Sequence, residues 1–239
     1  MFSIRTLLII GFIALTACSG GDRRVPQGIK DGILHMGNGT EPQGIDPHTT
    51  TGLPEHHIQQ ALFEGLVGLD PKTLDPIPGV AERWEISPDG RTYRFYLRRN
   101  ARWSNGDSIT AEDFRWTWWR GLQPALGNEY AYMLYPVKNA EAYATGKLTD
   151  FSQVGVRVID PYTLEVELNE PTPYFMQLLD HQSTYPLPRK VIEKFGSATD
   201  RFTAWTRPEN IVSNGPFKLT EWKLYKRVSV EKNPYYWDA

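Results

Sequence analysis

The chain has 239 residues, of which 40% are hydrophobic, 13% aromatic and 23% charged, and its formal net charge at pH 7 is −2. This balance is typical of a globular protein with one or two hydrophobic cores. The charge provides no basic excess, so nucleic acid is not expected as a partner. Eight Trp and twelve Tyr are many for this length, and partly exposed aromatic side chains often line ligand clefts or partner surfaces.

The N-terminal segment has the pattern of an export signal. Arg5 precedes an apolar run at residues 7–15 that is about half of the ~20 residues needed to cross a bilayer as a helix. The run leads into Leu-Thr-Ala-Cys, whose Cys18 is the only cysteine of the chain. A lone cysteine makes no intramolecular disulfide, and no Cys/His spacing around it suits a zinc site. We expect residues 1–17 to be a cleaved signal peptide.

Leu-Thr-Ala-Cys resembles the lipobox of bacterial lipoproteins, and this resemblance implies lipidation of Cys18. A buried or free thiol is the alternative. Residues 18–30 contain glycines, charges and a proline, as a flexible tether does. The protein is then anchored to a membrane without spanning it. Ser19 permits transfer to the outer membrane if the cell is Gram-negative.

The first elements expected after the tether are a strand at residues 33–36 and a helix that starts at Pro54 and has apolar residues at helical spacing through Phe63. Between them lies a loop at residues 41–48 with two prolines and a glycine. Ligands of α/β lobes gather where a strand ends and a helix begins, so this loop is a candidate for the binding region.

Alternating apolar residues predict three hairpins. In the first, Tyr93, Phe95 and Leu97 share one face after the turn Pro88-Asp89-Gly90. A short helix is predicted between the second and third hairpins. The predicted strand pairs are 84–87 with 92–97, 154–158 with 164–168, and 217–222 with 228–230, and the short helix covers 191–195.

A longer helix is predicted to begin at Thr110. Thr110 and Asp113 have the spacing of a capping box, with Asp in place of the usual Glu or Gln, and the helix continues through Leu122. We expect Trp119 to join the buried stripe of this helix and Trp118 to lie at its margin. The alternative is that the tryptophan pair forms a platform for a sugar.

Six segments in order resemble the extracytoplasmic solute-binding proteins of family 5, and most closely the members that bind oligopeptides for ABC transporters. Any one of them is weak, but together they extend from residue 41 to residue 238. The segments are EPQGIDPH, LFEGLVGLDP, PGVAERWEISPDGRTYRFYLRRNARWSNGDSITAEDF, EPTPYFMQLL, IVSNGPFKLTEW and EKNPYYWD.

The resemblance implies an α/β fold of the periplasmic-binding-protein type II, a clamshell with two lobes. On this plan residues 31–68 and 190–239 belong to the first lobe, and residues 69–189 form a mixed α+β subdomain inserted into it. Members of the family are much longer. We therefore expect that the second lobe is missing and that the chain is an N-terminal fragment.

The resemblance also implies where ligand binds. An extended peptide lies between the lobes and pairs as an added strand. By matching motifs, Thr51 and Leu53 lie at the edge of the first lobe near the amino end of the peptide. The hydroxyl of Tyr130 bonds the peptide backbone, and His181 approaches the carboxylate of a longer ligand. The family has an acidic residue where Thr51 stands, and the aspartate that pairs with the ligand ammonium lies in the second lobe. For each of these residues, packing alone is the alternative role.

The implied function is that of the lipid-anchored substrate-binding component of an ABC importer. It captures oligopeptides in the periplasm or at the cell surface and delivers them to the permease and ATPase complex. It acts as a monomer and uses no cofactor and no metal. Alternatives on the same fold are binding of murein peptides, of metal complexes such as those of nickel, or of signalling peptides.

A different class, an anchored hydrolase of wall polymers, is also considered. The chain has no Gly-x-Ser-x-Gly and no His-Glu-x-x-His sequence. His56 and His57 are adjacent, so on a helix they point about 100° apart and make a poor metal pair. A pair of catalytic carboxylates stays open as a mechanism. We expect no enzyme activity.

Overall fold

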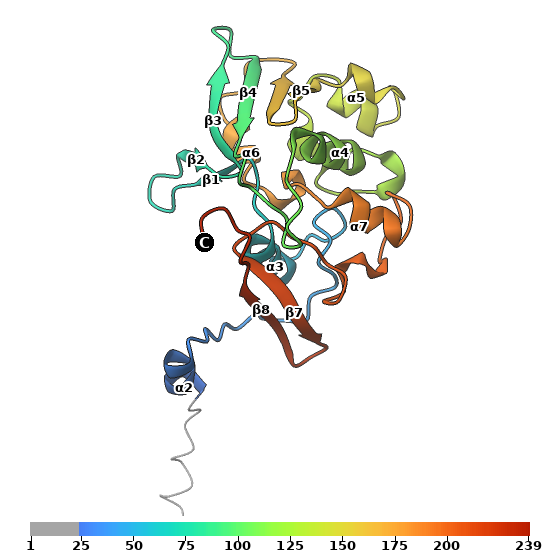
Figure 1. Cartoon of the computed structure of the whole chain (residues 1–239). Coiled ribbons are helices and arrows are strands. Elements are labelled where there is room, and N and C mark those ends of the chain that lie inside the picture. Colours follow the sequence, from blue (N-terminus) through green and yellow to red (C-terminus); the bar gives the residue numbers. More distant parts are fainter. Residues whose placement is uncertain (1–23) are drawn as a thin grey trace, which may run out of the picture. The chain divides into compact units, whose positions relative to one another are not determined.

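The computed structural model describes residues 24–239 (Figure 1). The expected signal peptide and Cys18 lie outside the described residues. The chain divides into two compact units, Met1–Gly39 and Thr40–Ala239. Within the described part of the chain, no helix is both long and apolar enough to span a bilayer.

In the first unit, helix α2 (Arg24–Asp31) occupies part of the segment that was expected to be an irregular tether. The side-chain amide of Gln27 donates to both carboxylate oxygens of Asp31 at 3.0 Å, one helical turn later. The strand expected at residues 33–36 is wrong, because the structure has irregular chain there with Leu34 82% exposed. A strand needs a neighbouring strand for its backbone groups, and among the described residues no strand lies beside this segment, where the N–H of Ile33 instead donates to the carbonyl of Gly28 at 2.7 Å.

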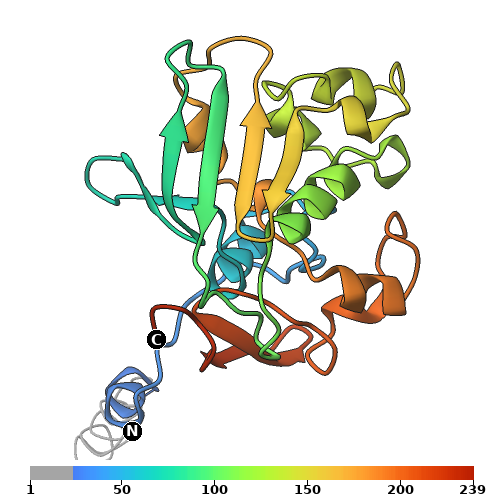
Figure 2. The same cartoon turned by 45° about the horizontal axis from the view of Figure 1, so that its top comes forward.

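The second unit combines short helices with three antiparallel sheets (Figures 1 and 2). Its helices are α3 (Leu53–Leu62), α4 (Ala111–Gly121), α5 (Ala140–Ala144), α6 (Phe175–Leu178) and α7 (Arg189–Lys194). Its strands are β1 (Val67–Leu69), β2 (Pro76–Pro78), β3 (Ala81–Ile86), β4 (Thr92–Leu97), β5 (Val156–Asp160), β6 (Thr163–Glu167), β7 (Phe217–Lys223) and β8 (Arg227–Lys232). Its 3-10 turns are η1 (Pro124–Leu126), η2 (Ala131–Leu134), η3 (Phe151–Gln153), η4 (Gln182–Thr184) and η5 (Ala204–Thr206).

The first two predicted hairpins are confirmed, and they join into one four-stranded sheet in the order β3-β4-β6-β5. Strands β4 and β6 pair in the middle, where Tyr93 faces Val166 and Phe95 faces Leu164. All four side chains are buried. Helix α4 contacts β5 and β6, and Figure 2 shows it beside the yellow strand of the sheet. The apolar residues between Leu66 and Leu179 form the first core around this sheet.

Helix α4 begins at the predicted capping box. The backbone N–H and the hydroxyl of Thr110 both donate to the Asp113 carboxylate, at 2.7 and 2.9 Å. The expectation for its tryptophans is wrong, because Trp118 is fully buried and Trp119 only partly. Trp118 follows Phe114 by one turn and faces the first core, where its indole N–H donates to the carbonyl of Thr184 at 2.9 Å.

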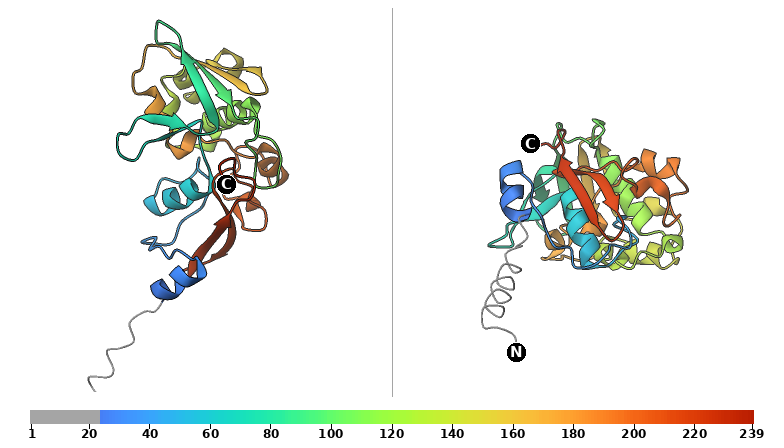
Figure 3. Two further views of the ribbon diagram at one scale, coloured as in Figure 1. Left: turned by 60° about the vertical axis from the view of Figure 1, so that its left-hand side comes forward. Right: turned by 90° about the horizontal axis from the view of Figure 1, so that it is seen from below.

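A second core lies apart from the four-stranded sheet. It combines residues between Ile45 and Phe63 with residues between Tyr185 and Leu219, and Trp116 of α4 also belongs to it. The predicted third hairpin is confirmed as β7–β8, which contacts α3 and lies at the far end of this unit from the four-stranded sheet (Figure 3, left). The backbone N–H of Gly215 donates to the carbonyl of Leu62 at 2.8 Å, so distant segments meet here.

Candidate functional site

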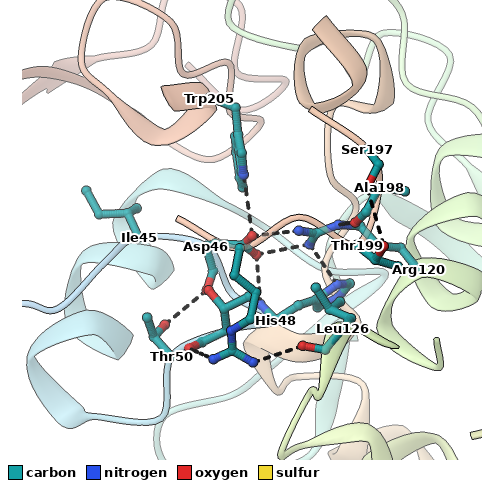
Figure 4. A network of polar contacts seen from close by, with 12 residues as sticks. Ile45, Asp46, His48, Thr50, Arg120, Leu126, Ser197, Ala198, Thr199 and Trp205 are labelled. Atoms are coloured by element: carbon teal, nitrogen blue, oxygen red, sulfur yellow. Dashed lines mark hydrogen bonds and ion pairs between the residues drawn. The ribbon is translucent and has the colours of Figure 1, made fainter. Parts of the chain in front are cut away.

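A buried ion pair between Asp46, in the loop at residues 41–48, and Arg120 fixes this loop to α4 (Figure 4). Two guanidinium nitrogens of Arg120, in α4, donate to the two carboxylate oxygens of Asp46 at 2.7 and 3.0 Å. Arg120 is 0% exposed and Asp46 is 5% exposed. The third nitrogen of Arg120 donates to the carbonyl of Ala198 at 2.7 Å, so α4 joins two segments that are distant in sequence.

The ion pair is ionised despite its burial. Loss of solvent acts to raise the pKa of Asp46, but the charge and hydrogen bonds of Arg120 outweigh it, so that pKa is lowered. The indole N–H of Trp205 points at the same carboxylate, with 3.4 Å between nitrogen and oxygen. A charge pair of this kind contributes specificity of geometry more than net stability, because desolvation offsets much of its attraction.

His48 extends the network from Arg120 to residue 183. Its Nδ1 lies 3.1 Å from a guanidinium nitrogen of Arg120 and its Nε2 lies 3.1 Å from the carbonyl oxygen of Ser183. Arginine only donates, so Nδ1 accepts and the proton resides on Nε2. Burial, together with the charge of Arg120, lowers the pKa of His48 to about 3, and the imidazole is neutral at physiological pH.

Hydrogen bonds of Thr50 connect the Asp46 network to α3. The hydroxyl of Thr50 donates to the carbonyl of Asp46 at 3.0 Å and accepts from the side chain of Gln59, in α3, at 2.8 Å. The same amide reaches the carbonyl of Ile45 at 3.3 Å. The chain therefore leaves the buried loop at a fixed point, directly before Thr51.

Thr51 and Gly52 form an extended segment directly before α3, whose first residue is Leu53. Thr51 is exposed, Leu53 is 71% exposed, and the backbone of Gly52 is extended, with φ −83° and ψ 153°. Within the described residues, no backbone N–H of residues 51–53 donates a hydrogen bond that the structure shows. Extended backbone with free amide groups is what an added strand pairs with.

The backbone at Gly52 lies close to the side chain of Glu55. A Cβ atom at this position would meet a carboxylate oxygen of Glu55 at 2.1 Å. Glu55 is buried in the first turn of α3, and its other oxygen accepts the backbone N–H of Gln43 at 2.5 Å. The carboxylate thus connects the loop at residues 41–48 to the helix, and the extended segment passes directly over it.

Tyr130 and His181 lie beside this segment. The hydroxyl of Tyr130 donates to the carbonyl of Thr51 at 3.2 Å. The ring of His181 packs edge-on against Tyr130 with ring centroids 4.4 Å apart. Both side chains are partly buried, and each stands at the start of a 3-10 turn, η2 and η4. The structure thus brings together Thr51, Tyr130 and His181, which are distant in sequence, while Leu53 projects into solvent.

Three further polar residues at this place were not foreseen. His56 has its Nδ1 2.9 Å from the side-chain oxygen of Gln182. Burial and the charge of His56 lower the pKa of His181 to about 4, whereas burial raises the pKa of Asp180. The adjacent pair His56-His57 was the signal for this cluster, although it was considered only for metal binding.

The chemistry available at this site is that of reversible binding. Its groups are backbone amides, a phenol, imidazoles and an amide side chain, all of which exchange hydrogen bonds with a polar ligand. Among residues 24–239, no group of three or more His, Cys, Asp or Glu side chains is arranged to hold a metal ion.

Residues 75–239 match a family model described as bacterial extracellular solute-binding proteins, family 5 middle. The chain belongs to this family. Its members are binding proteins and not enzymes, so the hydrolase alternative is not supported.

Individual relatives show which members of the family this chain is similar to. The chain is 40% identical over 236 residues to the periplasmic oligopeptide-binding protein OppA of Salmonella typhimurium. The matched region covers 97% of this chain and 41% of that protein. The crystal structure of Haemophilus influenzae OppA in complex with the peptide RPPGFSPFR has a TM-score of 0.78 at 43% identity, covering 84% of this chain and 38% of that one. The murein tripeptide-binding protein MppA of Escherichia coli has a TM-score of 0.76 at 35% identity, covering 83% and 38%. The chain thus spans well under half the length of these relatives.

Proposed function

We propose that the chain is part of the substrate-binding component of an ABC importer that captures oligopeptides outside the cytoplasmic membrane. The observation that carries this proposal is that Thr51 and Gly52 are extended and that the backbone N–H groups of residues 51–53 lack a partner within the described residues, beside Tyr130 and His181. The likeness to the OppA proteins supports it.

In the proposed mechanism the peptide adds a strand to residues 51–53. Pairing through main-chain groups provides affinity without reading side chains. Water between the ligand side chains and the protein satisfies varied polar groups, which allows a broad range of peptides. A micromolar dissociation constant corresponds to about −8 kcal/mol, which a few backbone hydrogen bonds and some burial supply while still allowing release to the permease.

We propose the domain division that the resemblance implies, with residues 31–68 and 190–239 in a first lobe and residues 69–189 in an inserted subdomain. The two cores support it in outline, because one is built around the four-stranded sheet and the other joins residues 45–63 to residues 185–219, with Trp116 as the contribution of α4. In this proposal a second lobe supplies the opposite wall of the peptide site.

We also propose that residues 18–30 tether the protein through a lipid on Cys18, in the periplasm or at the cell surface. This placement rests on the sequence pattern alone, since Cys18 precedes the described residues. The proposed partners are the permease and ATPase of the transporter, with the binding protein acting as a monomer.

The test uses two proteins. One is the 239-residue chain, and the other is the same chain continued by the C-terminal part of the Salmonella OppA protein that it does not match, which we call the completed protein. We expect native mass spectrometry with a mixture of tri- to pentapeptides to show intact peptides on the completed protein and far weaker binding by the chain alone.

Two outcomes would contradict the proposal. Hydrolysis of the peptides would indicate an enzyme, and equally tight binding by the chain alone would show that one wall is sufficient. Murein tripeptide is included as a separate ligand, because exclusive binding of it would replace oligopeptides by the ligand named for the MppA relative.

A further inference from the structure

A pocket of about 330 Å³ opens on the side of α4, and none of the four residues predicted to bind peptide lines it. Its wall consists of side chains from α4, from the segment that contains η3, and from α7. This volume is at the lower end of the ~300–1,000 Å³ typical of small-molecule sites. A ligand of one ring therefore fits its size.

Three aromatic rings line the pocket. Trp116 and Trp119, one turn apart on α4, have ring centroids 6.1 Å apart and planes inclined by 44°. Phe151, in η3, is 7% exposed. Trp119 remains partly exposed although it contacts both cores. Such faces stack against the C–H surface of a ring and leave its polar rim free.

The charges at the pocket balance. Arg115 pairs with Glu112, with 3.3 Å between nitrogen and oxygen, and its guanidinium carbon lies 5.5 Å from the centre of the Phe151 ring. Arg189 lies 5.9 Å from the centre of the Trp116 ring. Two guanidinium groups against the rings oppose a cationic ligand. Glu112 and Asp150 bring two negative charges, so an anion is not favoured either.

Hydrogen-bonding groups of both kinds remain open around the rings. Arg189 uses only its Nε, which donates to Glu193, and Arg115 uses one nitrogen for Glu112. Among residues 24–239, their other nitrogens and the second oxygen of Glu112 have no partner. A ligand whose hydroxyl groups both donate and accept matches this mixture of donors and acceptors.

We propose that this pocket binds a neutral sugar in the pyranose form. One face of the ring stacks on Trp119, and its hydroxyl groups bond to Arg115, Arg189 and Glu112. The site is independent of the peptide edge at residues 51–53. The ring belongs either to a free monosaccharide or to a longer glycan, and both present the same chemistry to the pocket.

The test uses the 239-residue chain and saturation-transfer NMR with glucose, galactose, mannose and N-acetylglucosamine at millimolar concentration. Glucuronate, glucosamine and indole serve as anionic, cationic and aromatic probes. Trp119→Ala removes the stacking face, and Ser152→Trp fills the pocket from an exposed position of its wall. Tyr174→Ala, at an aromatic residue outside the pocket that is 60% exposed, is the matched control.

We expect at least one neutral sugar to bind, with an affinity about ten-fold or more lower in both pocket variants and unchanged in the control. Circular dichroism and thermal unfolding verify that each variant is folded. Affinity that rises from monosaccharide to oligosaccharide indicates a glycan as the source, and equal affinity indicates a free sugar.

Three results would overturn the proposal. They are the absence of binding by every neutral sugar, binding that both pocket variants retain, and a clear preference for glucuronate, glucosamine or indole over the neutral sugars. Because no peptide takes part in these measurements, failure of the sugar site leaves the proposed peptide function untouched.

Discussion

The hydroxyl of Tyr130 donates a hydrogen bond to the carbonyl oxygen of Thr51 at 3.2 Å, although 79 positions separate the two residues in the chain. A carbonyl oxygen has two lone pairs, so Thr51 can accept this bond and a second one from a ligand amide. Tyr130 therefore holds the extended backbone at Thr51 and Gly52 in place and leaves the Thr51 carbonyl able to accept a second hydrogen bond.

Tyr130→Phe removes only the hydroxyl. We expect the completed protein to lose up to about 1 kcal/mol of peptide-binding free energy, roughly a five-fold rise in Kd, because the edge at Thr51 is less well held. Isothermal titration with one tripeptide measures it. Tyr132→Phe, at a neighbouring tyrosine that is 52% exposed, is the control. Equal Kd values for Tyr130→Phe and the parent would show that the hydroxyl of Tyr130 does not contribute to peptide binding.

Arg120→Met leaves the Asp46 carboxylate buried without its partner. We expect a loss of about 3–5 kcal/mol in the free energy of unfolding, measured by urea denaturation of the 239-residue chain. Arg83→Met, in an exposed pair with Glu85, is the matched control and should cause no measurable loss. Similar losses at both sites would mean that the buried pair does not organise the loop at residues 41–48.

His181→Asn tests the titration of the histidine beside Tyr130. In the folded chain the pKa of His181 is lowered to about 4, so the unfolded chain takes up a proton near pH 6.5 and the folded chain does so only near pH 4. The stability of the parent therefore falls across this window as the pH is lowered, and the variant lacks this contribution.

We expect urea denaturation of parent and variant at several pH values to show the parent losing stability relative to His181→Asn between pH 6.5 and pH 4. Asparagine retains an acceptor at the start of η4, where the histidine ring accepts the backbone N–H of Ser183 at 3.3 Å. A difference between the two proteins that does not change with pH would contradict the assignment of a buried, neutral imidazole.

Gly52→Ala places a methyl group against the Glu55 carboxylate. We expect a loss of about 1–3 kcal/mol in the free energy of unfolding, because the buried Glu55 carboxylate must turn away from the methyl group and strain its hydrogen bond to Gln43. The double variant with Glu55→Ala removes the clash, so its stability should equal that of Glu55→Ala alone. A further full loss in the double variant would indicate that backbone conformation, and not this carboxylate, requires glycine.

Local patterns predicted much of the framework. The alternation around residues 93–97 and 164–168 predicted strands whose apolar residues face one core, and Thr110 with Asp113 predicted the start of α4. These features depend on residues that are close together in the chain, so a single sequence is enough to predict them. The strand expected at residues 33–36 failed because strand formation requires a partner that local sequence does not reveal.

The sequence by itself determined the family and the three hairpins, and resemblance predicted Thr51, Leu53, Tyr130 and His181 as ligand-binding residues, which stays a prediction. Only the tertiary structure decided that Trp118 and not Trp119 is fully buried, and that Asp46, His48 and Arg120 support the loop before Thr51. The physical reason is that burial and ion pairing depend on which segments meet. Helix α4 is enclosed by two cores, and its buried arginine finds its carboxylate 74 positions away in the chain.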